Sequence, residues 1–194
     1  MNLAILECNR YYYTFIFVLL NTTRMKRSEI KKMPEYFDRY INLVEDIDVV
    51  DALKKNSPNL FDREKLTLLG DKVYEPGKWT VKEMIQHLID AERIFTYRAL
   101  RYARNDKTVL PGFDENTYVP NSEAGIRNLE DLFIEYNTVR QSTIYMYQSF
   151  SNEMLEHEGI SFNRDISVLA VGFTIAGHAI HHNNILKERY YKLI

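Results

Sequence analysis

The chain has 194 residues, of which 45% are hydrophobic and 27% are charged, and its formal net charge is −2. This length fits one domain with a sizeable core, and the charge excludes a general electrostatic attraction to nucleic acid or to an anionic membrane. The single cysteine, Cys8, cannot form an internal disulfide, which favours a reducing, cytoplasmic location.

The first 24 residues differ from the rest of the chain. An apolar run from 11 to 20 is too short to span a bilayer as a helix, and no cleavage site typical of a signal peptide follows it. Met25 and the sequence after it resemble an ordinary protein start. We expect residues 1–24 to lie outside the domain, with no stable membrane insertion, and residues 25–194 to form one domain. An export signal or a membrane anchor is the alternative.

The first helical pattern spans 37–47, where apolar residues recur every three or four positions. A shorter helix is predicted over 60–69, and Gly70 ends it. The next helix begins at Thr80, which forms a capping box with Glu83. Its apolar stripe comprises Met84, Leu88, Ala91, Phe95, Ala99 and Tyr102.

Turn-forming residues concentrate between 105 and 127 and predict a long loop, and loops of that length are often functional. A third long helix is expected over 129–150. The last helix runs from about Ser167, a capping residue, to Tyr190 and is apolar nearly all round, so we expect it to be buried on more than one side. No strand pattern is visible, and the chain therefore predicts an all-α fold, a four-helix bundle.

Three histidines are candidate metal ligands. His178 and His182 are four residues apart, so they share one face of the last helix. His87 lies on another helix, which a bundle can bring opposite that face. Three imidazoles would bind a divalent metal and leave a position open, as in catalytic zinc sites. Such ligands must be neutral, so affinity should fall as the pH drops below about 6.5.

Structural roles compete with this interpretation. An H-x-x-x-H pair also arises by chance, and both histidines could be core or interface residues with satisfied hydrogen bonds. His181 could chelate together with His178, although His182 remains with the same apolar stripe. Asp90 and Glu92 lie near His87 in the sequence and could orient its imidazole, or could simply belong to a solvated helix face.

Three separate segments resemble the DinB-like superfamily: PGKWTVKEMIQHLIDAERIFTYRALRYAR, LPGFDENTYV and GFTIAGHAIHHNNILKERY. The resemblance covers about Met33 to Tyr191 and is closest to small bacterial proteins related to metal-dependent thiol transferases. It implies a four-helix bundle with one histidine on the second helix and an H-x-x-x-H pair on the fourth. The matching residues are His87, His178 and His182.

The resemblance also implies zinc or nickel as the metal and a low-molecular-weight thiol, such as bacillithiol, mycothiol or glutathione, as a co-substrate. Without residues 1–24 the domain contains no cysteine, so a small molecule has to supply any thiol. We expect transfer of that thiol to a small electrophilic substrate. A metal-dependent hydrolase with the same ligands is one alternative. A non-enzymatic stress-response or dimerisation module with structural histidines is another, and the apolar last helix suits a monomer core or a homodimer interface.

Overall fold

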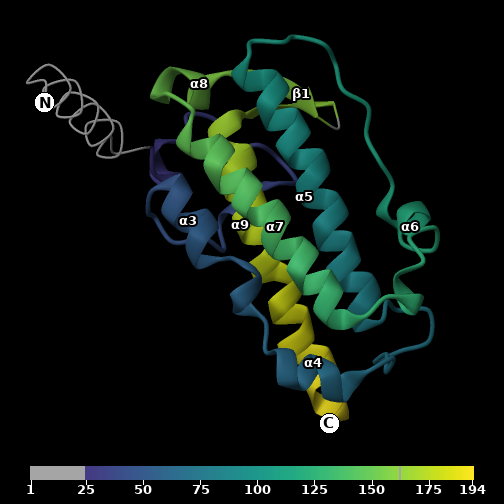
Figure 1. The fold of residues 1–194 in the computed structure, drawn as a ribbon. Helices are drawn as coiled ribbons and strands as arrows, with labels where there is room; N and C mark the ends of the chain where they lie inside the picture. The colour runs from purple at the N-terminus through teal and green to yellow at the C-terminus, as the bar shows by residue number, and fades with distance from the viewer. Residues whose placement is uncertain (1–24, 162) are drawn as a thin grey trace, which may run out of the picture.

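The computed structural model describes residues 25–161 and 163–194 (Figure 1). Three long helices dominate it: α5 (Val81–Ala103), α7 (Leu129–Gln148) and α9 (Val168–Ile185). The shorter elements are η1 (Arg27–Glu29), α2 (Asp38–Ile41), α3 (Val49–Lys55), η2 (Pro58–Leu60), α4 (Arg63–Leu69), α6 (Glu115–Tyr118), η3 (Ala124–Ile126), α8 (Asn152–Glu156), β1 (Glu158–Ser161), β2 (Arg164–Ser167), η4 (Leu186–Tyr190, a π-helix) and η5 (Tyr191–Leu193).

The long helices form a four-helix bundle whose first member is divided. α5 packs against both α7 and α9, while α2 and α3 pack along α9 and take the fourth position. α5 and α7 run in the same direction, so the chain between them returns along the outside of the bundle (Figure 1). The all-α bundle expected from the periodicity is confirmed. The prediction that residues 1–24 lie outside the domain concerns a segment beyond the described residues.

The helix predicted over 37–47 is wrong, because only α2 is helical there and residues 42–47 form turns that lead to α3. Aspartate side chains bind backbone amides here, which competes with helix formation. Asp46 accepts a hydrogen bond from the amide of Ser28 at 2.8 Å, and Asp48 caps α3 by accepting from the amide of Val50 at 2.8 Å.

The expectation of no strands is also wrong, since β1 and β2 form an antiparallel hairpin between α8 and α9. The expected long loop contains α6 and η3. Other local signals are confirmed. Thr80 and Glu83 form the capping box of α5, Gly70 ends α4 with a φ of 55°, and the Ser167 hydroxyl caps α9.

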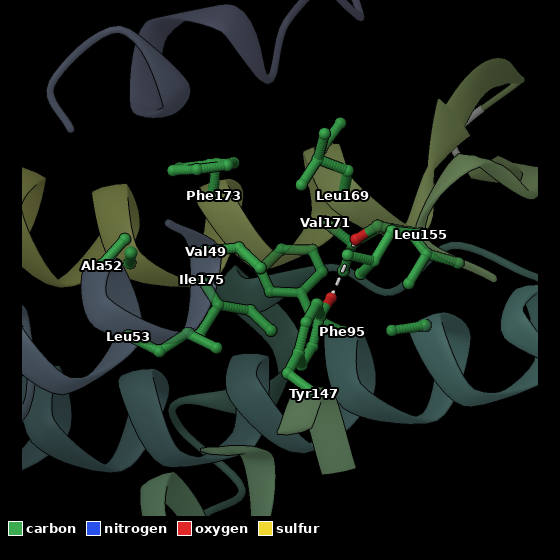
Figure 2. Packing of buried hydrophobic residues seen from close by; sticks show 14 of the residues in the cluster. Val49, Ala52, Leu53, Phe95, Tyr147, Leu155, Leu169, Val171, Phe173 and Ile175 are labelled. Carbon is green, nitrogen blue, oxygen red and sulfur yellow. Dashed lines mark hydrogen bonds between the residues drawn. The ribbon is translucent and has the colours of Figure 1, made fainter. Parts of the chain in front are cut away.

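The main core lies where α3 and α9 meet the far halves of α5 and α7. Figure 2 shows Val49 and Leu53 of α3 beside Ile175 of α9, with Phe173 on another side of that helix. The Tyr147 hydroxyl donates a hydrogen bond to the carbonyl oxygen of Val168 at 3.0 Å. A second cluster joins α4 to the first turns of α5 and α7 and includes Phe61, Leu66, Leu88, Leu132 and Phe133.

Among the described residues, no helix combines the length and the apolarity needed to cross a membrane.

Candidate metal centre

His87 occupies the second turn of α5, close to the capped start of that helix. The Trp79 side chain, from the residue before the cap, lies against it, with ring centroids 4.8 Å apart. The same indole is nearly parallel to the ring of His182, 6.5 Å away. The helix cap and the packed indole together orient His87 toward α9.

His178 and His182 lie one turn apart on α9, which is buried around most of its circumference. The backbone of Tyr40 lies close to α9 at Gly177, the residue before His178. An added Cβ at Gly177 would lie 2.5 Å from the carbonyl carbon of Tyr40 and closer still to its oxygen. Only glycine therefore permits this packing. The Tyr40 ring contacts that of His178 edge-on at 5.1 Å.

The three imidazoles converge through their Nε2 atoms. The Nε2 of His178 lies 3.2 Å from that of His87 and 3.0 Å from that of His182. A ring nitrogen carries either one proton or one lone pair, so His178 cannot make both contacts as full hydrogen bonds. Zn–N bonds of about 2.0–2.1 Å in tetrahedral geometry put ligand nitrogens roughly 3.3 Å apart. The donor set and its spacing fit an ion such as zinc or nickel.

Burial keeps these imidazoles neutral, the form in which a histidine binds metal. All three side chains are 6–7% exposed. Burial and, to a smaller extent, the nearby His181 lower the pKa of His87 from its usual 6.5 to about 4. Burial also lowers the pKa values of His178 and His182 well below that of a free imidazole.

His181 does not join this cluster. It is partly buried and packs against Tyr40, with ring centroids 5.2 Å apart. The sequence preference for His182 over His181 therefore agrees with the positions of the rings. His157 lies elsewhere, with its Nδ1 atom 3.2 Å from the carbonyl oxygen of Ala103.

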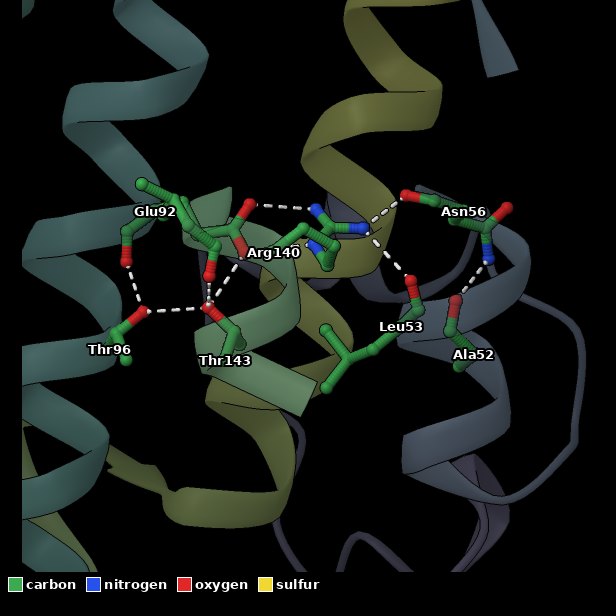
Figure 3. Close-up of polar contacts among 8 residues, drawn as sticks. Ala52, Leu53, Asn56, Glu92, Thr96, Arg140 and Thr143 are labelled. Carbon is green, nitrogen blue, oxygen red and sulfur yellow. Dashed lines mark hydrogen bonds and ion pairs between the residues drawn. The ribbon is translucent and has the colours of Figure 1, made fainter. Parts of the chain in front are cut away.

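Asp90 and Glu92 are not placed to orient His87. Asp90 accepts a hydrogen bond from Gln86 at 2.9 Å. Glu92 lies five residues beyond His87 and therefore faces α7 rather than α9. There it forms a buried, bidentate ion pair with Arg140, with both N–O distances at 2.8 Å (Figure 3).

The ion pair has a structural role. Arg140 also donates to the carbonyl oxygens of Leu53 and Asn56 at the end of α3, and Thr143 donates to Glu92 at 2.8 Å (Figure 3). These contacts supply the carboxylate and the guanidinium with hydrogen-bond partners, which a buried ion pair requires. They also tie the short α3 to two long helices.

A cavity of about 200 Å³ opens onto the three histidines. Sequence reasoning missed most of its other residues, because they come from α2, from the start of α5 and from the connection before α7. Two of them are charged, Arg39 and Glu115. The family-like segment LPGFDENTYV contains Glu115, and this was the one sequence signal for it. The remaining lining includes Tyr36, Phe37, Tyr40, Trp79, Phe95 and Phe113.

Comparison with known proteins adds two findings. A sequence model of the DinB superfamily matches residues 37–186. A solved structure, described as "YfiT from Bacillus subtilis is a probable metal-dependent hydrolase with an unusual four-helix bundle topology", is similar to the chain with a TM-score of 0.59. It is 16% identical, and the match covers 82% of this chain and 88% of that one, so the likeness shows the fold alone. No curated protein matches the chain.

Proposed function

The chain belongs to the DinB superfamily, and we propose that it is a metal-dependent enzyme that transfers a low-molecular-weight thiol to a small electrophilic substrate. One observation carries the proposal: three buried imidazole nitrogens converge on the wall of a cavity. Three neutral ligands leave the charge of a divalent cation uncompensated, which favours an anionic fourth ligand.

His87, His178 and His182 would hold the ion. When bound, a divalent cation supplies a Lewis acid that lowers the pKa of a thiol or a water molecule beside it. The aromatic rings of Trp79 and Tyr40 pack against the imidazoles and keep bulk water from their faces. Residues 25–194 contain no cysteine, so the thiol comes from a small molecule that enters the cavity.

A metal-dependent hydrolase is the second candidate. The structural similarity to YfiT, described as a probable metal-dependent hydrolase, favours it. The same three ligands would serve either reaction, because the outcome depends on whether a thiol or water occupies the open position.

Metal analysis of the purified protein tests the shared premise. We expect about one zinc or nickel ion per chain, and loss of that ion in His178→Ala. His157→Ala is the matched control, since that histidine lies outside the cluster. Absence of metal from the wild type, or equal metal content in His178→Ala, refutes the proposal.

Turnover then separates the candidates. With 1-chloro-2,4-dinitrobenzene, a thiol transferase forms a sulfur–carbon bond, releases chloride and gives the thiol proton to the buffer. Metal-dependent consumption of bacillithiol or glutathione in this assay supports thiol transfer. Cleavage of 4-nitrophenyl acetate without thiol consumption supports the hydrolase instead. A metal-loaded protein with neither activity supports a binding module.

A further inference from the structure

Two opposite charges line the cavity and do not pair with each other. Arg39 comes from α2 and Glu115 from α6, which are far apart in the sequence. Neither makes an ion pair with any residue in the described ranges; Arg39 is exposed and Glu115 is partly buried. The cavity therefore offers one cationic and one anionic partner to a ligand.

The Arg39 guanidinium is held in place by aromatic rings. Its Cζ atom lies 3.9 Å from the centroid of the Tyr36 ring and 4.7 Å from that of Tyr40, and its Nη2 donates to the Tyr40 hydroxyl at 2.8 Å. Tyr36 has a φ of 72°, in the left-handed region that bulky residues rarely adopt. This costly backbone conformation places the Tyr36 ring over Arg39 and preorganises the cation.

Both charges lie near the histidine cluster. Tyr40, which contacts Arg39, also packs edge-on against His178, so one aromatic ring separates the guanidinium from the imidazoles. Glu115 lines the same cavity as Tyr40 and the three histidines. Asp114 fixes the start of α6 by accepting a hydrogen bond from the amide of Asn116 at 2.9 Å. The backbone on both sides of the cavity is therefore held by local contacts.

The cavity determines which part of a ligand lies beside the histidines. Its volume of about 200 Å³ is smaller than the roughly 300–1,000 Å³ typical of sites for drug-sized molecules, so the part of the ligand inside it is small. A ligand that contacts Arg39, Glu115 and the histidines together carries three different groups. An aminothiol with a free ammonium and a free carboxylate has these groups.

We propose that Arg39 binds the carboxylate and Glu115 the ammonium of a zwitterionic aminothiol, whose sulfur then lies toward the three histidines. This inference rests on the proposed thiol chemistry and names the class of thiol. It treats Arg39 and Glu115 as determinants of specificity for the thiol and assigns neither of them a part in bond breaking.

Cobalt-loaded full-length protein provides a direct binding assay, because a thiolate bound to cobalt gives a near-ultraviolet charge-transfer band. Four thiols test the contribution of each charged group to binding at pH 7. 2-Mercaptoethanol carries neither charge, 3-mercaptopropionate carries only the carboxylate, cysteamine carries only the ammonium, and L-cysteine carries both. We expect each charged group to tighten binding roughly tenfold, the usual effect of a charge-assisted hydrogen bond. L-cysteine should also bind roughly tenfold tighter than D-cysteine, which chelates free cobalt equally well. Cobalt retained after desalting checks that the thiol has not extracted the metal.

Two variants assign the contacts. Arg39→Gln should abolish the advantage of 3-mercaptopropionate and keep that of cysteamine, and Glu115→Gln should do the reverse. Both should lose the preference for L-cysteine while binding 2-mercaptoethanol as the wild type does, which shows that the site is intact. Arg104→Gln and Glu153→Gln, at exposed positions away from the cavity, should match the wild type.

The outcomes distinguish the two proposals. Equal binding of all the thiols by the wild type overturns the assignment of Arg39 and Glu115 but leaves thiol transfer standing. An advantage for only one of the two singly charged thiols also overturns it, because a zwitterion needs both contacts. If no thiol produces the charge-transfer band on the cobalt-loaded protein, the proposed function itself fails.

Discussion

Gly177→Ala should destabilise the protein although alanine favours helices. In the interior of α9 the substitution gains about 1 kcal/mol in helix propensity. The new Cβ, however, would lie 2.5 Å from the carbonyl carbon of Tyr40, where ordinary contact begins at 3.4 Å. The Cβ would meet backbone atoms rather than a flexible side chain, so α2 would have to move away from α9. We therefore expect a destabilisation of about 3 kcal/mol from this overpacking, the upper end of the usual range. The net loss is about 2 kcal/mol.

Thermal and urea melts followed by circular dichroism measure this effect. A loss of about 2 kcal/mol should lower the melting temperature by roughly 4–8 °C for a protein of this size. Gly125→Ala is the control, because nothing lies within 4 Å of the added Cβ there, and its stability should change by less than about 0.5 kcal/mol. A Gly177→Ala protein as stable as the wild type would refute the claim that glycine is required for the contact between α9 and Tyr40.

Three further predictions concern the fold and the site. Phe133→Ala should lower the free energy of unfolding by about 3–5 kcal/mol, because the side chain is fully buried. His182→Ala should lose metal but still melt cooperatively. If the histidine variant unfolds and Phe133→Ala does not, the histidines have a structural role. The metal-free protein should lose stability as the pH falls from about 6.5 to 4, because His87 binds a proton at a higher pH in the unfolded chain than in the folded protein. Denaturant titrations should show that this residue lowers the free energy of unfolding by about 3 kcal/mol over that range. The loss should be smaller in His87→Gln. A chain starting at Met25, which is buried and accepts a hydrogen bond from the amide of Val49, should melt as cooperatively as the full chain, and a large drop in melting temperature would contradict this.

The pH prediction refines the one made from the sequence. Free imidazole values imply that protons compete with the metal below about pH 6.5. Burial lowers the pKa of His87 to about 4, so the folded site resists protonation to a lower pH than the sequence alone indicates. This effect depends on packing around the ring, which a sequence pattern does not reveal.

Periodicity predicted the long helices because their apolar stripes are continuous over many turns. It failed at 37–47, where the apolar spacing is helical but Asp46 and Asp48 bind backbone amides instead. It also missed the β1–β2 hairpin, whose four-residue strands are too short to establish an alternating pattern. Local hydrogen bonds and short elements therefore account for the errors in the fold.

The residues of the candidate site, like the elements of the fold, could be predicted from the sequence only in part. His178 and His182 could be paired from their spacing, and resemblance to the family added His87. Arg39 and Glu115 reach the cavity only through tertiary contacts of α2 and α6, so no local pattern connects them with the histidines. Glu92 shows the opposite error, since it is close to His87 along the chain but turned toward Arg140.

The separation of the ligands along the chain determines when the site can first exist during synthesis. His87 and His178 are 91 residues apart. At about 5–20 residues per second, a ribosome needs roughly 5–18 s to advance from one to the other. A nascent chain that has made α5 and α7 therefore presents a single imidazole, too few for a stable complex. An ion held by all three histidines would be acquired late, when α9 packs onto the helices already made, so the supply of metal would act on nearly finished chains and would have no part in starting the fold.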